Sequence, residues 1–230
     1  MSTNLAQQLR EGTTKSHSMA ENVSFVKSFL GGVVDKKSYR KLVANLFFVY
    51  SAIEEEIERN KFHPAIKLIY FPELNRKESL ERDLLYYYGP NWLSQIKPST
   101  ATQIYVDRIH AIGKNQPELL ISHAYTRYMG DLSGGQILKK IAKNAMHLSD
   151  DKGTQFYVFK DIEDDNVFKQ LYRKALDDVP VSSDQATQII SEANVAFNLN
   201  MRMFQELDSN LIKIMVMLLF SVIGSFRKRI

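Results

Sequence analysis

Apolar residues recur every three or four positions along most of this chain, the spacing that places them on one face of an α-helix. Between about residues 36 and 60 the expected inward positions are Tyr39, Leu42, Val43, Leu46, Phe47, Tyr50 and Ile53. In the same segment Glu54-Glu55-Glu56 is expected to be solvated. No stretch alternates apolar and polar residues long enough to predict a convincing strand, and only 156–159 is expected to be a brief extended piece. The pattern predicts an all-α fold.

Prolines and glycines divide this pattern into about eight helices. Gly31-Gly32 is expected to end the first helix, and Ser99 is a candidate N-cap. The expected helices cover residues 3–30, 36–60, 76–88, 99–113, 117–148, 163–178, 184–207 and 211–226. Because no repeat, low-complexity run or linker marks a boundary, residues 1–230 are expected to form a single-domain helical bundle.

The C-terminal stretch, residues 210–230, is strongly apolar and has a basic end at Arg227-Lys228-Arg229. Its apolar core, residues 211–226, is shorter than the roughly 20 residues that cross a bilayer, and it contains Lys213. We therefore expect a packing helix here and no membrane span. The polar N-terminus has no signal-peptide core, which favours a cytoplasmic protein.

Composition excludes several kinds of function. The chain has no cysteine, which rules out disulfides, thiolate metal ligands and protein-bound iron–sulfur clusters. The net charge is +4, and no basic run is interleaved with aromatic residues, so nucleic-acid binding is not expected. An anionic ligand or an acidic protein partner suits this charge.

The segment 125–136 holds three of the ten glycines of the chain, Gly130, Gly134 and Gly135, between ordinary helix formers. Each glycine inside a helix costs about 1 kcal/mol relative to alanine. Gly130 and Gly134 share a helix face, a spacing that fits close packing against another helix and also the close approach of a flat ligand. Arg127 and Asp131, four residues apart beside them, favour a polar, water-holding pocket.

Two of the five histidines are candidate ligands. His17 is followed four residues later by Glu21, a carboxylate that can orient the imidazole of a metal ligand, and Arg10 precedes it by two turns. His123 lies seven residues before Gly130 and so shares its helix face. Spacing alone does not choose between His17 and His123.

The run 123–142 closely resembles the distal-helix signature of the haem oxygenases. The similarity extends roughly from residue 5 to residue 207 and includes the stretches 9–17, 54–60 and 70–74. The chain is most similar to the soluble bacterial and plastid-type members. The resemblance implies a bundle that holds haem b between the first helix and a glycine-kinked distal helix. Haem would be both prosthetic group and substrate.

The implied reaction opens haem at the α-meso carbon with O2, giving biliverdin IXα, CO and Fe2+. The electrons must come from outside, because the chain has neither a dinucleotide-binding glycine motif nor cysteines for a cluster. Resemblance to the soluble enzymes favours an acidic ferredoxin over a flavoprotein reductase, as in photosynthetic organisms. Lys139, Lys140 and Lys143 form a candidate docking patch. A haem carrier or sensor without turnover, and a helical interaction protein without cofactor, are the alternatives.

The resemblance also implies roles for individual residues. His17 would ligate the iron, oriented by Glu21, and Asp131 would organise proton-donating water. The remaining residues implied around the oxygen are Gly130, Gly134, Gly135, Arg127 and Tyr50. Those implied to bind the propionates or border the macrocycle are Arg10, Tyr125, Lys169, Arg173, Val26, Phe29, Phe197 and Phe204. The family often has lysine at the position of Arg10, and the forked guanidinium changes the contact geometry expected there.

Overall fold

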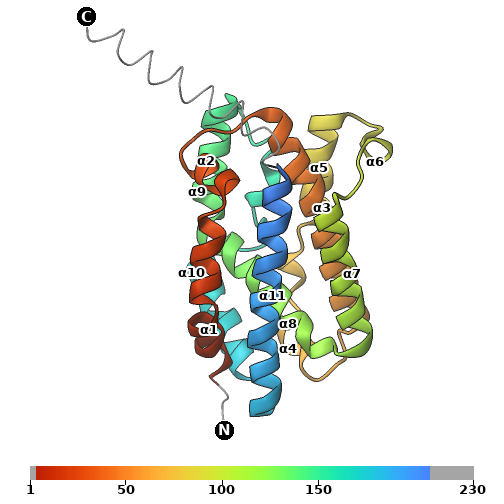
Figure 1. Ribbon diagram of the computed structural model, residues 1–230, viewed down its shortest axis with the longest axis vertical. Coiled ribbons are helices and arrows are strands. Elements are labelled where there is room, and N and C mark those ends of the chain that lie inside the picture. The colour runs from red at the N-terminus through yellow and green to blue at the C-terminus, as the bar shows by residue number, and fades with distance from the viewer. Residues whose placement is uncertain (1–3, 208–230) are drawn as a thin grey trace, which may run out of the picture.

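Helices and the turns between them make up residues 4–207, the part of the chain that this computed structural model describes (Figure 1). This range contains no strand, so the all-α prediction is confirmed. The expected helix 211–226, with the rest of the apolar stretch 210–230, lies outside the described residues. No helix within residues 4–207 combines the length and hydropathy that a bilayer span requires.

Short polar side chains set several helix starts, as capping predicts. Asp35 accepts a hydrogen bond from the Ser38 amide at 2.9 Å, and Ser99 accepts one from the Thr102 amide at 3.3 Å. The longer helices are α1 (Leu5–Glu21), α2 (Ser24–Leu30), α3 (Lys36–Arg59), α5 (Lys77–Tyr88), α7 (Thr100–Asn115), α9 (Gly130–Met146), α10 (Asp165–Asp177) and α11 (Ser183–Leu207). The shorter ones are α4 (Ile66–Ile69), η1 (Pro72–Leu74), α6 (Trp92–Gln95), η2 (Pro117–Leu119), α8 (Leu120–Ala124), η3 (Tyr125–Met129) and η4 (Gln155–Tyr157).

The predicted first helix, 3–30, is divided in two, and that prediction was wrong. Val23 has an extended backbone with ψ of 135°, and the Asn22 side chain donates to the Ser18 carbonyl at 2.8 Å. A polar side chain that bonds a backbone carbonyl one turn earlier competes with helix continuation, which explains the break. Gly31-Gly32 ends α2 as expected, with Gly32 at φ +78°.

The predicted helix 117–148 is also not a single regular element. Its irregularity is η3, a π-helical turn that lies before the glycines, whereas α9 runs regularly through Gly130, Gly134 and Gly135. π-helical turns inside α-helices occur often at functional sites. Here the turn sets the rotation of α9 relative to α8.

The long helix α11 lies between α1 and α7 and contacts both (Figure 1). On the other side α3 packs against α5 and α7. The core that results is rich in aromatic residues, and Tyr39, Tyr50, Tyr105 and Tyr172 are among its largest fully buried side chains. These contacts hold α1 and α9 apart, on opposite sides of a common cavity.

The segment 155–159 is placed by long-range hydrogen bonds. Asp83 of α5 accepts from the amides of Gln155 at 2.9 Å and Phe156 at 2.8 Å. The buried Arg76 donates to the Val158 carbonyl at 2.7 Å. The expected extended piece at 156–159 is wrong, because η4 is a single 3₁₀ turn and only then does the backbone extend.

Glu56 is fully buried, so the expectation that Glu54-Glu55-Glu56 is solvated was wrong for this residue. Its carboxylate accepts from Arg59 and lies 2.6 Å from His110 Nδ1. The neighbouring helix α7 passes close here at Gly113, where a Cβ atom would clash with the Glu56 carboxylate. Packing of α7 against α3, rather than any feature of the triplet, buries this side chain.

Candidate active site

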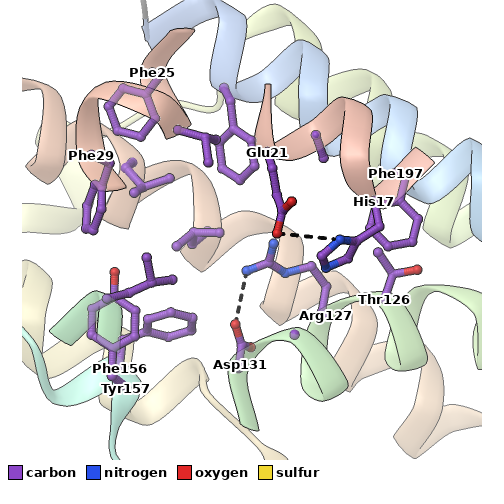
Figure 2. A pocket seen from close by; sticks show the side chains of 17 residues that line it. His17, Glu21, Phe25, Phe29, Thr126, Arg127, Asp131, Phe156, Tyr157 and Phe197 are labelled. Atoms are coloured by element: carbon purple, nitrogen blue, oxygen red, sulfur yellow. Dashed lines mark hydrogen bonds and ion pairs between the residues drawn. The ribbon is translucent and has the colours of Figure 1, made fainter. Parts of the chain in front are cut away.

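A cavity lies between α1 and α2 on one side and η3 and α9 on the other (Figure 2). It contains about 880 Å³ of free space, counted out into its open mouth. Most of its wall is apolar, and the polar side chains that face it are His17, Glu21, Thr126, Arg127, Asp131 and Tyr157.

His17 faces the cavity from α1, with 60% of its side chain exposed. Its Nδ1 lies 3.6 Å from Glu21 Oε1, one turn along the helix (Figure 2). The edge of its ring packs against Phe197, with centroids 5.8 Å apart. The carboxylate of Glu21 thus lies on the Nδ1 side of the ring.

His123 does not line this cavity. It is fully buried, and its Nε2 lies 3.0 Å from Glu192 Oε1 on α11. Arg108 Nε holds the same carboxylate oxygen at 2.9 Å. Spacing left the choice between His17 and His123 open, and this packing removes His123 from the candidate site.

On the opposite wall, α9 contributes Gly130, Asp131 and Leu138. A Cβ atom added at Gly130 or at Gly134 would have no protein atom within 4 Å, and Gly130 has ordinary helical angles, φ −64° and ψ −47°. Neither close packing against another helix nor an unusual backbone requires glycine there. At Gly135 an added Cβ would make ordinary contact with Tyr157, at 3.7 Å.

A hydrogen-bonded network lies behind this wall. The Tyr50 hydroxyl donates to Asp131 Oδ2, and Arg127 donates from Nε to the Tyr50 oxygen at 2.9 Å. Arg127 Nη2 lies 3.4 Å from Asp131 Oδ1, and its Nη1 donates to Asn200 Oδ1 at 2.9 Å. Asn200 in turn donates to the Tyr105 hydroxyl at 3.2 Å. Asn200 was not predicted to be a site residue. The one indication in the sequence is that Asn200 shares a helix face with Phe197, three residues earlier.

Burial dominates the electrostatics of this network. It raises the pKa of Asp131, and Arg127 and the Tyr50 hydroxyl lower it only in part. Burial also raises the pKa of Tyr50 well above its usual range. Burial alone would lower the pKa of Arg127, but Tyr50 and Asp131 beside it produce a net rise, so its charge is permanent. The site thus contains a fixed cation next to a carboxyl group that binds a proton more readily than usual.

The predicted propionate ligands lie outside the cavity wall itself. Tyr125 is half-buried, and burial raises its pKa. A hydrogen bond with Thr13 lowers this pKa in part, as do the positive charges of Arg173 and Arg10. The charges of Arg10 on α1 and of Arg173 on α10 thus both act on Tyr125 of η3. Lys169 precedes Arg173 by one turn of α10 and is partly exposed.

The apolar wall includes all four predicted macrocycle neighbours, Val26, Phe29, Phe197 and Phe204. The sequence analysis missed Leu42, Leu46, Leu138, Phe156 and Tyr157, which line it as well. Leu42 and Leu46 precede Tyr50 at intervals of four, so helical spacing could have identified them. Phe156 and Tyr157 carry no such signal, because long-range hydrogen bonds place them.

These features fit a haem. The cavity walls are apolar, a histidine with an orienting carboxylate stands on one wall, and bare helix backbone stands on the other. Gly130, which no protein contact requires, leaves room for a flat group against α9. Fold and site together define an all-α haem protein.

The chain belongs to the haem oxygenase family, whose model, described as "Heme oxygenase", matches residues 3–206. It is 68% identical to a haem oxygenase of Porphyra purpurea over 98% of this chain and 96% of that protein. It is 61% identical to haem oxygenase 1 of Synechocystis over 96% of this chain and 92% of that protein.

A solved structure of Synechocystis haem oxygenase-1 in complex with haem has a TM-score of 0.91 and 60% identity, covering 96% of this chain and 100% of that one. Synechocystis haem oxygenase-2 with haem and NO has a TM-score of 0.90 and 46% identity, covering 93% and 88% of the two chains. The protein is thus an O2-dependent haem-degrading enzyme, with haem as both prosthetic group and substrate.

Proposed function

We propose that the enzyme opens haem at the α-meso carbon to biliverdin IXα, releasing CO and Fe2+, with His17 Nε2 as the protein ligand of the iron. The observation that carries this proposal is the placement of His17 and the Gly130–Asp131 region on opposite walls of one cavity. When bound, haem supplies the iron that binds and activates O2 and the ring that is oxidised.

In this proposal His17 holds the haem iron and orients the haem. A carboxylate at Nδ1 favours the tautomer that presents a lone pair at Nε2, and the Phe197 ring limits rotation of the imidazole. Glu21 is the orienting carboxylate.

Gly130, Gly134 and Gly135 shape the oxygen side. With no side chains on Gly130 and Gly134, the backbone of α9 would leave room for the haem and would limit the directions from which oxygen could reach the ring.

Asp131 moves protons. Its raised pKa lets it hold a proton more readily than an ordinary aspartate does, and Tyr50 and Arg127 hold its two carboxylate oxygens in place. The charge of Arg127 stabilises negative charge that develops on the oxygen side.

Arg10, Tyr125, Lys169 and Arg173 bind the two propionates and so fix the rotation of the haem about its ligand bond. Charge-assisted hydrogen bonds from arginine to carboxylates are among the stronger polar contacts in proteins. This rotation decides which meso carbon faces the oxygen, which gives the α-regiochemistry.

A ferredoxin is the proposed electron donor. The whole sequence has no cysteine and a net charge of +4, so electrons arrive from a separate protein and an acidic one is favoured. The candidate patch at Lys139, Lys140 and Lys143 is weaker than its sequence suggests, because Lys139 and Lys143 both pair with Asp151 at 2.9 Å. Lys140 is the exposed cation of the three.

The test is a spectrum of the protein with one equivalent of haem, before and after ascorbate in air, for wild type, His17→Ala and His123→Ala. Wild type should give a sharp Soret band that decays to the broad red absorption of biliverdin. His17→Ala should change the Soret band and lose turnover. His123→Ala should keep the Soret position, because its cost is loss of the Glu192 hydrogen bond in the core.

A Soret band unchanged in His17→Ala would refute the ligand assignment. A wild-type band that never bleaches would support a haem carrier. The regiochemistry is checked by chromatography of the product, and propionate variants such as Arg173→Ala should yield a mixture of biliverdin isomers.

A further inference from the structure

His17 lies in the half of α1 that has no buried side chain. The buried residues of this helix are Leu5, Ala6, Leu9 and Thr13. All of α1 belongs to the described part of the chain, and none of its residues from 14 to 21 is buried. Apolar packing therefore holds mainly the first half of α1, and the turns that carry His17 and Glu21 depend on other contacts.

Asn194 of α11 supplies such a contact through its side-chain amide. Its Nδ2 donates to the Gly12 carbonyl at 3.1 Å, and its Oδ1 accepts from the Ser16 hydroxyl at 2.5 Å. Gly12 and Ser16 are four residues apart, so one amide group bonds both ends of the helical turn that immediately precedes His17.

The amide of Asn194 fits this place in a single orientation. Its Nδ2 also donates to the Ile190 carbonyl of α11 at 2.9 Å, so both of its N–H groups have a carbonyl partner while Oδ1 faces a hydroxyl. A flipped amide would place Oδ1 against two carbonyl oxygens, which repel it. These bonds therefore hold α1 at one position along α11.

The two helices are also closest at this point. A Cβ atom on Gly12 would clash with the side chain of Ile190. One turn after Asn194, the ring of Phe197 packs against His17, with centroids 5.8 Å apart (Figure 2). Packing and hydrogen bonds from the same face of α11 thus act on the same stretch of α1.

We propose that Asn194 is a positioning residue for the haem reaction, because through Gly12 and Ser16 it sets the place of His17 opposite Gly130. The inference rests on the proposed role of His17 as the iron ligand. It adds what keeps that ligand at a fixed distance from the oxygen side. A misplacement of about 1 Å can slow a reaction about a hundredfold, so a half-helix without buried side chains needs such an attachment.

The experiment compares wild type with Asn194→Asp, which replaces Nδ2 by an oxygen of the same size facing two carbonyls. Ser16→Ala removes the hydroxyl partner, and Ser16→Thr keeps it. The matched control is Asn198→Asp, the same change at an exposed position one turn further along α11.

Three quantities are measured on the full chain. Amide hydrogen exchange of the haem-free protein reports on residues 5–13 and 14–21 separately. Resonance Raman spectra of the ferrous haem complex give the iron–histidine stretching band. Ascorbate-driven haem decay gives the rate.

We expect Asn194→Asp to raise exchange in residues 14–21 about tenfold while residues 5–13 stay near wild type, because only the second half of α1 loses its attachment. The iron–histidine band should shift or broaden, and haem decay should slow about tenfold or more. Ser16→Ala should change all three quantities in the same direction by less, Ser16→Thr should restore them, and Asn198→Asp should match wild type.

Two results would overturn the inference. Unchanged exchange of residues 14–21 in Asn194→Asp would show that the amide does not hold α1. Faster exchange together with a wild-type iron–histidine band and decay rate would show a structural contact that does not position the ligand. If Asn194→Asp does not fold, Ser16→Ala decides by the same criteria, since alanine at this partly exposed helix position favours the helix.

His17→Ala separates these results from failure of the proposed function. An iron–histidine band that persists in His17→Ala refutes the ligand assignment itself. Loss of that band in His17→Ala, beside a wild-type band and rate in Asn194→Asp, refutes the positioning role alone.

Discussion

No protein contact explains why Gly130 and Gly134 of α9 are glycines, and we attribute them to the bound haem instead. Gly130 has helical angles and no protein neighbour that a Cβ atom would meet. In an ordinary helix such a glycine lowers stability by about 1 kcal/mol relative to alanine. The protein therefore carries a local cost that only the ligand side of the helix accounts for.

Gly130→Ala should consequently leave the haem-free protein as stable as wild type, or more stable by up to about 1 kcal/mol, while slowing haem opening. The added methyl group would occupy the oxygen side of the cavity, and displacements of this size can slow a reaction about a hundredfold. Urea denaturation of the haem-free protein and ascorbate-driven haem decay measure the two effects separately.

Gly113→Ala is the matched control, since that Cβ atom would clash with the buried Glu56 carboxylate far from the cavity wall. It should destabilise the protein without a specific effect on the haem reaction. A Gly130→Ala protein that is clearly less stable than wild type would contradict our explanation of that glycine.

At the scale of single residues, the sequence predicts which side chains pair when the partners are close together in the chain. His17 and Glu21 are four residues apart, as are Arg127 and Asp131, and each pair lies side by side as this spacing predicts. Glu56 shows the limit, because its burial depends on α7, a helix that begins about forty residues later.

Among the elements, η4 shows most clearly what sequence periodicity cannot predict. This turn presents Phe156 and Tyr157 to the haem cavity, yet its position depends on Asp83, which is more than seventy residues away in the chain. Helical periodicity predicted the long helices, whereas this short piece has no period. Its place follows from pairing buried amides with a buried carboxylate.

Asp83→Ala should lower the free energy of unfolding by about 1–3 kcal/mol, because two buried amides lose their acceptor. Burial raises the pKa of Asp83 to about 6, which shows that the buried carboxylate is itself costly. Removing this cost offsets part of the stability lost with the two hydrogen bonds. Haem binding should weaken as well, since η4 would no longer be held against the cavity. Urea denaturation at mildly alkaline pH and haem titration check both.

Asp107→Ala, which removes an exposed aspartate of α7, is the control and should change stability by less than about 0.5 kcal/mol. Equal stability of Asp83→Ala and Asp107→Ala would show that the amides of η4 find other partners.

At the scale of the whole molecule, Glu192 links three helices. Its carboxylate on α11 joins His123 of α8 and Arg108 of α7, and only 5% of its side chain is exposed. Burial alone would raise the pKa of Glu192, but His123 and Arg108 lower it from 4.5 to about 2. Burial also lowers the pKa of His123.

Stability should therefore fall as the solution is acidified. Between the ordinary pKa of 4.5 and the folded value of about 2, the unfolded chain binds a proton that folded Glu192 does not. The contribution of Glu192 is complete above pH 4.5 and is lost as the pH falls toward 2, about 2–3 kcal/mol in all. His123 acts in the same direction below about 6.5. Urea denaturation at a series of pH values measures this slope.

Glu192→Gln supplies the comparison. It should be less stable than wild type at neutral pH and should lose less stability on acidification. Parallel curves for the two proteins would mean that Glu192 does not carry the acid sensitivity.

The π-helical turn η3 makes the active site depend on a count of residues. Successive residues of an α-helix are rotated by about 100° around its axis, so one residue fewer between positions 125 and 129 would turn all of α9 by that angle. Deletion of Met129 would remove no group named in the site and would leave a more regular helix. It would nonetheless carry Gly130, Gly134 and Asp131 around the axis, away from His17. Deletions here are therefore expected to abolish function in proteins that still fold, a pattern that substitution scanning would not reveal.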